Sequence, residues 1–195
     1  GAYSPAPVVT PAVYERAMNE IILPTVAGMK AEGHEFTGFL YAGLMIDQSG
    51  APYTIEFNCR FGDPETQPIM SRLNSDLSDL VEAAIDGKLD SVTAEWNPQT
   101  AVGVVLAAQN YPETPKKGDV ISGLDDANQF GKVFHAGTTA NEKGDVLTNG
   151  GRVLCVVGLG NDVAQAKAKA YSALEKISFD GMQYRKDIAD KAINR

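Results

Sequence analysis

The chain has 195 residues, of which 44% are hydrophobic and 22% are charged, and its formal net charge is −8 at pH 7. This balance is typical of globular proteins and allows one large domain or two small ones. The acidic charge and the scattered Lys and Arg residues argue against a nucleic-acid surface. The longest apolar runs fall short of the roughly 18 residues that a membrane-spanning helix needs, so no membrane segment is expected.

Few residues suited to thiol or imidazole chemistry occur in the chain. Cys59 and Cys155 lie far apart and form no Cys-x-x-Cys pair, which predicts two free core thiols and a reducing compartment, the cytoplasm. Only His34 and His135 are present, so a histidine triad or a His-rich metal site has little support. The chain begins without Met and without the features of a signal peptide, and we therefore expect a piece of a longer protein.

The first predicted element is an amphipathic helix that ends near Gly33. Thr10 is the expected N-cap and Pro11 occupies the first turn. Pro24 cannot donate a hydrogen bond to the carbonyl of Glu20, so a kink or break is expected there. The apolar face at helical spacing comprises Tyr14, Ala17, Met18, Ile21, Ile22, Val26 and Met29.

A β-hairpin and two helices are predicted next. Residues 36–46 form an almost wholly apolar segment, which predicts a buried strand, and residues 53–60 predict its partner across a turn at 47–50. Residues 66–73 predict a short helix, and a second helix is expected to follow Ser75 as its N-cap.

After a connector at residues 87–100 the chain changes to short strands separated by Gly-containing turns. Strands are predicted at residues 102–108, 119–121, 132–134, 146–148 and 153–157. A turn at 158–161 is expected to lead into a helix that Asn161 or Asp162 caps and that ends near Ile177, and a last helix is expected from Asp187. The change of character predicts two domains, residues 1–100 and 101–195.

Three polar side chains share one face of the second hairpin strand. Side chains alternate along a strand, so Glu56, Asn58 and Arg60 point one way, and Phe57 and Cys59 point to an apolar face. Carboxylate and amide oxygens suit Mg²⁺, and a guanidinium suits a phosphate or carboxylate. A metal and phosphate site is one interpretation of this spacing. On spacing alone, a solvent-facing Glu–Arg pair followed by a plain helix cap is the favoured interpretation, because short motifs often match by chance.

Longer strings of sequence resemble a known family. Residues 56–67 read Glu-Phe-Asn-Cys-Arg-Phe-Gly-Asp-Pro-Glu-Thr-Gln and closely resemble the phosphoribosylamine–glycine ligase family of the ATP-grasp superfamily. Further matching segments are residues 1–7, 39–45, 132–138, 148–154 and 185–188. The resemblance implies an α+β fold, with the C-terminal half of an ATP-grasp core (an antiparallel sheet with helices) over residues 1–100. A small β-rich C-terminal domain with a βα unit would follow.

The resemblance also implies an activity. Members of the family join glycine to 5-phosphoribosylamine in purine biosynthesis, through a glycyl phosphate, while ATP is cleaved to ADP and phosphate. Mg²⁺ or Mn²⁺ is the implied cofactor and ATP the co-substrate. The implied partners are these small molecules and the missing N-terminal part of the same enzyme, which is expected to be a cytoplasmic monomer without nucleic-acid or membrane contacts.

The family's functional residues carry over to matching positions. The resemblance implies that Glu56 and Asn58 bind the metal, with Asn58 also facing the ATP phosphates. It implies catalytic roles for Arg60, towards the phosphoryl group or the glycine carboxylate, and for Asp63, which either holds the glycine ammonium or orders its loop. The remaining expected contacts are Leu44 and Ile46 with the nucleotide, and Gly1, Ser4 and Gly62 with the substrates.

One departure from the wider superfamily affects these expectations. Many ATP-grasp enzymes carry another acidic metal ligand on the preceding strand, whereas residues 44–46 here are Leu-Met-Ile. Leu44 and Ile46 are therefore either nucleotide contacts or plain core residues. Two other functions stay open: another ATP-grasp ligase or carboxylase, and a non-enzymatic stand-alone binding module. A severed half of an enzyme should expose an apolar surface, which a stand-alone module should not.

Overall fold

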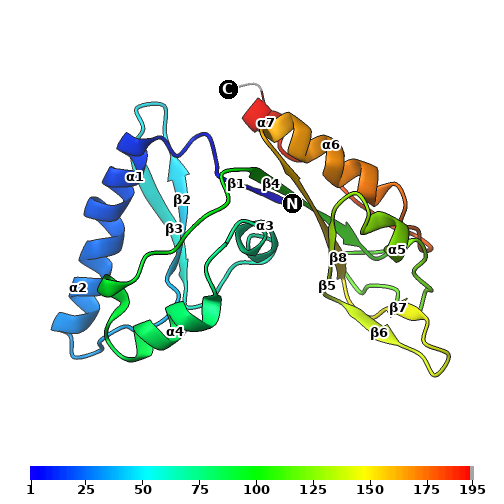
Figure 1. Ribbon diagram of the computed structural model, residues 1–195, viewed down its shortest axis with the longest axis horizontal. Coiled ribbons are helices and arrows are strands. Elements are labelled where there is room, and N and C mark those ends of the chain that lie inside the picture. The colour runs from blue at the N-terminus through cyan, green and yellow to red at the C-terminus, as the bar shows by residue number, and fades with distance from the viewer. Residues whose placement is uncertain (194–195) are drawn as a thin grey trace. The chain divides into compact units, whose positions relative to one another are not determined.

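The computed structural model describes residues 1–193, and the chain forms two compact units (Figure 1). The sheet unit consists of residues 1–4, 63–72 and the described residues from 97 onward, and the hairpin unit consists of residues 5–62 and 73–96. The units thus exchange chain segments, and the single boundary near residue 100 stays a prediction. Within residues 1–193, no helix combines the length and the apolar character needed to cross a membrane.

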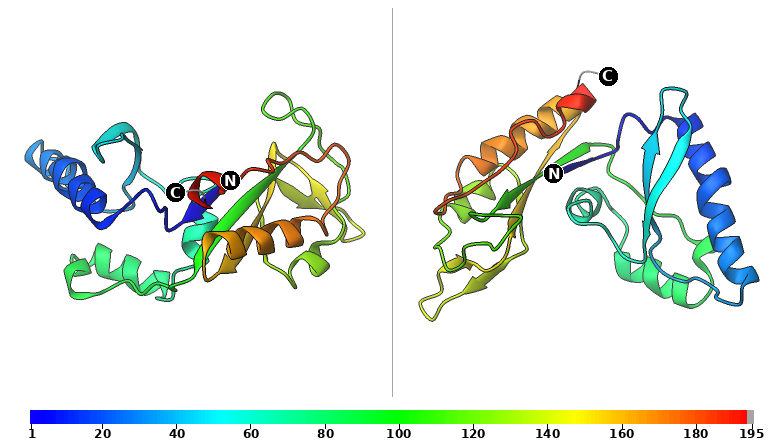
Figure 2. Two further views of the ribbon diagram at one scale, coloured as in Figure 1. Left: turned by 90° about the horizontal axis from the view of Figure 1, so that it is seen from above. Right: turned by 180° about the vertical axis from the view of Figure 1, so that it is seen from behind.

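The sheet unit is built on a four-stranded antiparallel sheet in the order β1-β4-β8-β5. The strands are β1 (Ala2–Ser4), β4 (Thr100–Ala107), β5 (Lys132–His135) and β8 (Arg152–Gly160). Helix α6 (Val163–Leu174) follows β8 directly and lies along one face of the sheet (Figures 1 and 2). The predicted α+β class, the antiparallel sheet and the βα unit are confirmed, whereas β1 was not anticipated.

Strand alternation divides the core between the two faces of this sheet. Val104 and Leu106 from β4 join Leu154 and Val156 from β8 in the cluster packed against α6, and all four are fully buried. The opposite face carries a smaller cluster, with Ala101, Cys155 and Val157 buried beside Val105, Phe134 and Leu159. Burial raises the pKa of the Cys155 thiol to about 12, so this cysteine is the core residue that the sequence predicts.

The predicted turn at residues 158–161 is wrong, because β8 runs on to Gly160. A Cβ atom on Gly158 would lie 2.4 Å from the carbonyl oxygen of Ala166 and 2.5 Å from the backbone nitrogen of Ala170. The absence of a side chain at Gly158 therefore lets α6 pack directly against the strand. The helix is capped by Asp162, which was one of the two predicted caps and which accepts a hydrogen bond from the Gln165 nitrogen at 2.7 Å.

Short elements complete the sheet unit. They are α3 (Thr66–Met70), α5 (Leu124–Ala127), β6 (Thr138–Ala140), β7 (Val146–Thr148) and α7 (Asp190–Ile193). Strands β6 and β7 pair as a ribbon, and the predicted strand at 119–121 contributes only a single bridge from Val120 to Leu147. Helix α7 begins three residues later than predicted, and α5 and β6 were not anticipated.

The first helix of the hairpin unit continues through Pro24 instead of breaking. It comprises α1 (Pro11–Ala17), a π-helical segment (Met18–Ile22) and α2 (Leu23–Ala31). The predicted N-cap is confirmed, since the Thr10 hydroxyl accepts a hydrogen bond from the Val13 nitrogen at 3.3 Å. A π-helical segment just before a proline re-spaces the backbone hydrogen bonds, which lets the helix continue past a residue that has no N–H to donate.

The predicted hairpin is confirmed as β2 (Tyr41–Ile46) paired antiparallel with β3 (Pro52–Asn58). In its turn the Asp47 carboxylate accepts hydrogen bonds from the nitrogens of Ser49 and Ala51 at 2.8 and 2.9 Å. The first strand begins five residues later than predicted, because residues 36–40 are irregular.

Helix α4 (Leu77–Ile85) is capped by Asp76, which accepts a hydrogen bond from the Ser78 nitrogen at 2.8 Å. The predicted cap, Ser75, instead accepts a hydrogen bond from the Glu95 nitrogen at 2.7 Å. Asp76 has the better position because its side chain lies one residue closer to the unpaired amides of the first turn.

Most of the large apolar side chains that remain exposed belong to the hairpin unit. They include Tyr14, Met29, Phe39, Met45, Tyr53, Ile55, Phe57, Ile85 and Trp96. The predicted burial of β2 and β3 is therefore wrong for this chain, in which Met45 is 60% and Ile55 is 66% exposed. The apolar face of α4 likewise lines an open hollow of about 420 Å³ with Phe39 and Val92. Apolar surface on this scale is typical of a face that another segment covers.

The contact between α6 and β8 predicts the effect of adding one methyl group. Gly158→Ala should lower the free energy of unfolding by about 1–3 kcal/mol, because the new Cβ meets backbone atoms that cannot move aside locally. Gly28→Ala is the matched control, since the added Cβ has open space on α2 and should be neutral or raise stability by about 0.5–1 kcal/mol. Chemical denaturation followed by circular dichroism measures both. Equal midpoints for Gly158→Ala and the unchanged chain would contradict the close packing.

Candidate functional site

Two of the predicted metal ligands meet on β3. The Asn58 side-chain amide donates a hydrogen bond to the Glu56 carboxylate at 3.2 Å. The register shifts by one residue here, from Leu44 opposite Thr54 to Gly43 opposite Glu56. A Cβ atom on Gly43 would lie 3.1 Å from Cγ of Glu56, so the glycine leaves room for the carboxylate. The structure therefore brings Glu56 and Asn58 together as one oxygen-rich pair.

The surroundings of this pair differ from the expected ones. The strand is exposed over most of its length, and so are Glu56, Phe57 (41%) and Cys59. The prediction that Cys59 is a core residue is wrong. Burial of unpaired charge, which was one argument for a bound ion, therefore does not apply in this chain. The case for a metal rests on the chemistry of the donors.

The oxygens of Glu56 and Asn58 suit a hard divalent cation. Mg²⁺ typically takes one or two carboxylates from the protein and completes its octahedron with phosphate oxygens and waters. Within the part of the chain that the structure describes, no group of three or more His, Cys, Asp or Glu residues could hold a metal. The pair therefore fits an ion that shares its coordination sphere with a bound nucleotide, and does not fit a closed protein cage.

Four other predicted residues belong to the same hairpin unit. Arg60 donates a hydrogen bond from Nη1 to the carbonyl oxygen of Phe61 at 2.9 Å, and its side chain is exposed. Leu44 and Ile46 lie on β2 and are half-buried, and Gly62 is buried. Their predicted ligand contacts stay predictions.

The other three predicted residues belong to the sheet unit. The Asp63 carbonyl oxygen accepts a hydrogen bond from Nη1 of Arg152, and the same nitrogen lies 3.4 Å from the Asp63 carboxylate. Gly1 lines a hollow of about 340 Å³. Ser4 lies on β1, where its hydroxyl accepts a hydrogen bond from Arg72 at 2.9 Å.

Arg72 is a structural residue that sequence reasoning missed. Its Nε donates to the carbonyl oxygen of Gln99 at 2.8 Å, and burial lowers the pKa of the guanidinium. The hydroxyl of Ser4 is therefore engaged in holding the sheet unit together. Ser4 therefore has a structural contact with Arg72, and its predicted contact with a substrate stays a prediction.

Three further polar residues of the sheet unit were also missed. Arg152 donates from Nε to the Tyr111 hydroxyl at 2.9 Å while it contacts Asp63. Among residues 1–193, the buried side-chain oxygen of Gln67 has no hydrogen-bond partner. Arg152 and Gln67 lie inside the strings that resemble the ligase family, which was the available signal, whereas Tyr111 carried no signal in its local sequence.

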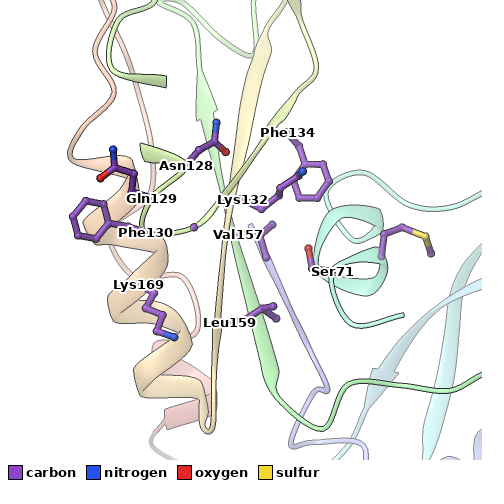
Figure 3. A pocket seen from close by; sticks show the side chains of 11 residues that line it. Ser71, Asn128, Gln129, Phe130, Lys132, Phe134, Val157, Leu159 and Lys169 are labelled. Carbon is purple, nitrogen blue, oxygen red and sulfur yellow. The ribbon is translucent and has the colours of Figure 1, made fainter. Parts of the chain in front are cut away.

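A separate hollow of about 580 Å³ lies on the sheet unit (Figure 3). Its lining residues are Met70, Ser71, Asn128, Gln129, Phe130, Gly131, Lys132, Phe134, Val157, Leu159 and Lys169. Lys132 comes from β5 and Lys169 from α6, so the hollow has two cationic side chains. None of the residues predicted from the sequence lines it.

Solved structures with low sequence identity share this fold. The urea carboxylase of Kluyveromyces lactis matches 93% of this chain and 16% of its own length, with 16% identity and a TM-score of 0.61. The biotin carboxylase of Campylobacter jejuni matches 97% of this chain and 43% of its own length, with 15% identity and a TM-score of 0.59. At this identity the similarity shows a common fold and nothing further.

Family models and closer relatives identify the group within this fold. Residues 1–66 match the ATP-grasp (A) domain of phosphoribosylglycinamide synthetase, and residues 101–191 match its C domain. The chain belongs to the phosphoribosylglycinamide synthetase family and is a portion of such a protein. The predicted family is therefore confirmed.

The relatives and one solved structure carry the name phosphoribosylamine–glycine ligase. The protein of Neisseria meningitidis serogroup B is 96% identical over all of this chain, which covers 46% of that protein. The protein of Ralstonia nicotianae is 60% identical with the same coverage. The crystal structure of the Thermotoga maritima protein matches 96% of this chain and 45% of its own length, with 37% identity and a TM-score of 0.83. The chain thus spans about half the length of these relatives.

The two cysteines should react very differently. Cys59 is exposed, whereas Cys155 is buried with its pKa raised to about 12, so almost none of the Cys155 thiol is ionised at pH 8. Titration of the folded chain with Ellman's reagent should give one fast thiol, and the second should react only after unfolding in guanidinium. The Cys59→Ser variant should have no fast thiol. Two fast thiols in the native chain would contradict the burial of Cys155.

Proposed function

We propose that the complete protein, of which this chain is about half, joins glycine to 5-phosphoribosylamine to give glycinamide ribonucleotide, with cleavage of ATP to ADP and phosphate. The observation that carries the proposal is the meeting of Glu56 with Asn58 inside a string that resembles the ligase family. The match of residues 1–66 to an ATP-grasp domain supports the use of ATP. The names of the relatives support the choice of amine and acid.

The proposed reaction has two steps in which atoms and charges balance. A glycine carboxylate oxygen attacks the γ-phosphorus of ATP, so that ADP leaves and glycyl phosphate forms. The amine nitrogen of phosphoribosylamine then attacks the glycyl carbonyl carbon and loses a proton, and inorganic phosphate leaves as the amide bond forms. Both steps place negative charge on phosphate oxygens, so positioning and charge neutralisation are the protein's main contributions.

Residues of the hairpin unit would act on the phosphates. Glu56 and Asn58 would hold Mg²⁺ or Mn²⁺, which when bound offsets negative charge on the triphosphate. Arg60 has an exposed guanidinium and would neutralise either the transferring phosphoryl group or the glycine carboxylate. Leu44 and Ile46 would contact the nucleotide, because both are apolar and half-buried on the neighbouring strand.

Residues of the sheet unit would act on the substrates. Asp63 would hold the glycine ammonium or fix the loop that follows Gly62. Gly1 and Ser4 would lie near the phosphoribosylamine, and the hollow beside Gly1 supports this placement for Gly1. Gly62, the last residue of the hairpin unit before Asp63, would let the chain approach a substrate closely, since it carries no side chain.

We also propose a cytoplasmic monomer as the form of the complete protein. The two free cysteines, one of them exposed, support a reducing compartment. The apolar residues of the hairpin unit are exposed in this chain, which supports the proposal that another part of the same protein covers them. The division into domains 1–100 and 101–195 is compatible with the two family matches, which end at residue 66 and begin at residue 101.

Glu56→Gln in the complete protein tests the metal role. The variant should lower kcat/KM for Mg·ATP by at least about 100-fold, because it replaces the anionic ligand by a neutral amide of the same shape. Thermal unfolding should stay unchanged, since the side chain is exposed. Glu82→Gln removes an exposed carboxylate from α4 and should leave turnover unaffected. An unchanged Mg²⁺ dependence in Glu56→Gln would reject the ligand role.

Residues 1–195 expressed alone should not turn over. The oxygen pair on β3 lies on an exposed hairpin, and ATP needs further cationic and apolar contacts to be held there. Formation of glycinamide ribonucleotide from ATP, glycine and phosphoribosylamine is the measurement, with the complete protein as the positive control. Formation of glycinamide ribonucleotide by the isolated chain would contradict the prediction. Lack of product from the complete protein would overturn the proposed function.

A further inference from the structure

Arg152 makes three contacts with two partners inside the sheet unit. Its Nε donates to the Tyr111 hydroxyl at 2.9 Å. Its Nη1 donates to the carbonyl oxygen of Asp63 and lies 3.4 Å from the Asp63 carboxylate. The guanidinium plane thus connects the residue that begins the loop before α3 to a tyrosine 48 positions later in the chain.

Tyr111 is itself held in place by the backbone next to Arg152. The Ala108 nitrogen donates to the carbonyl oxygen of Gly151 at 2.9 Å, and the Tyr111 nitrogen donates to the carbonyl oxygen of Ala108 at 3.2 Å. A Cβ atom on Gly151 would lie 2.5 Å from the Tyr111 ring, so only glycine lets the ring lie against this strand. The tyrosine hydroxyl is therefore a fixed acceptor for the guanidinium.

These contacts act through geometry more than through charge. The Arg152 and Asp63 side chains are 39% and 52% exposed, and an ion pair this exposed contributes at most about 1 kcal/mol. A guanidinium, however, presents several donors in one plane and can bond Tyr111 and Asp63 at the same time. The hydrogen bond to the backbone of Asp63 fixes the position from which the carboxylate projects. A lysine ammonium lacks this planar fork.

The residue that follows Asp63 lines a hollow large enough for a small ligand. Tyr111 and Arg152 line a hollow of about 340 Å³ together with Gly1 and Pro64, the residue that follows Asp63. A carboxylate at this position is useful to a reaction only if its direction is fixed, because a misplacement of about 1 Å can cost 100-fold in rate.

We propose that Arg152, oriented by Tyr111, is a positioning residue for Asp63 in the ligase reaction. The inference rests on the proposed function and adds two residues to it. Arg152 acts on the reaction through Asp63, so removing the guanidinium matters only while the Asp63 carboxylate is present. A purely structural role for Arg152 predicts no such dependence.

A double-mutant cycle in the complete protein tests the coupling. Arg152→Gln should lower kcat/KM for glycine by about 10- to 100-fold, the range expected for hydrogen bonds that involve a charged group. In the Asp63→Asn background, Arg152→Gln should lower kcat/KM for glycine by less than about 3-fold. The carboxylate through which Arg152 acts is then already absent, so the two effects are not additive. KM for ATP should stay unchanged in both backgrounds.

Conservative variants separate the fork from the charge. Arg152→Lys keeps the positive charge but should lose activity as Arg152→Gln does. Tyr111→Phe removes only the oxygen that accepts from Nε of Arg152, and it should lower kcat/KM for glycine by a smaller factor. Lys143→Gln removes an exposed cation between β6 and β7 and is the control that should leave turnover unchanged. Thermal unfolding of each variant separates loss of positioning from loss of folding.

The outcomes distinguish the two proposals. An active complete protein in which Arg152→Gln keeps the same kcat/KM would overturn the positioning role and leave the function standing. Equal losses from Arg152→Gln in both backgrounds would overturn it too, because Arg152 would then act independently of Asp63. If the complete protein without any substitution has no ligase activity, the proposed function is overturned, and the positioning role with it.

Discussion

The antiparallel pairing of β4 with β8 is the constraint on which the sheet unit depends. Both strands are buried over nearly their whole length, so every side chain on either face must pack against a neighbour. Helix α6 meets this demand on one face, and only glycine at positions 158 and 160 allows it to come close enough. Short strands β1 and β5 then complete the edges of the sheet, and β1 brings Ser4 within reach of Arg72.

The hairpin unit has no comparable pair of strands that are buried on both faces. Strands β2 and β3 form a two-stranded sheet, and Met45, Ile55 and Phe57 are left exposed on it. Two strands alone are marginally stable in water and normally need a third strand or a packed helix. The polar pair Glu56 and Asn58 lies on this same hairpin, next to the exposed apolar residues. The relatives that this chain matches are about twice as long as it is.

Local sequence rules succeeded at most positions where the controlling interaction is local, although they named Ser75 in place of Asp76 as the cap of α4. The sequence predicts Thr10 as one helix cap and Asn161 or Asp162 as another, because a capping oxygen bonds an amide only three residues away, as those of Thr10 and Asp162 do. The hairpin turn at Asp47 was recognised for the same reason. The rules failed at Gly158 and Gly160, which do not form a turn. These glycines lie in a strand, where the missing side chain makes room for a helix. Hydrophobic content predicted a buried hairpin, but burial depends on what lies against the strand, which its own sequence does not contain.

By itself the sequence determined the α+β class, the family, the order of the main elements and the alternation that places Glu56 beside Asn58. These features follow from hydrogen bonds between near neighbours, from side-chain periodicity, and from long strings shared with relatives. Only the tertiary structure decided that Cys59 is exposed, that Ser4 is held by Arg72, and that Arg152 joins Tyr111 to Asp63. Such contacts join residues tens of positions apart, and the packing of the sheet, not the local chain, brings them within reach.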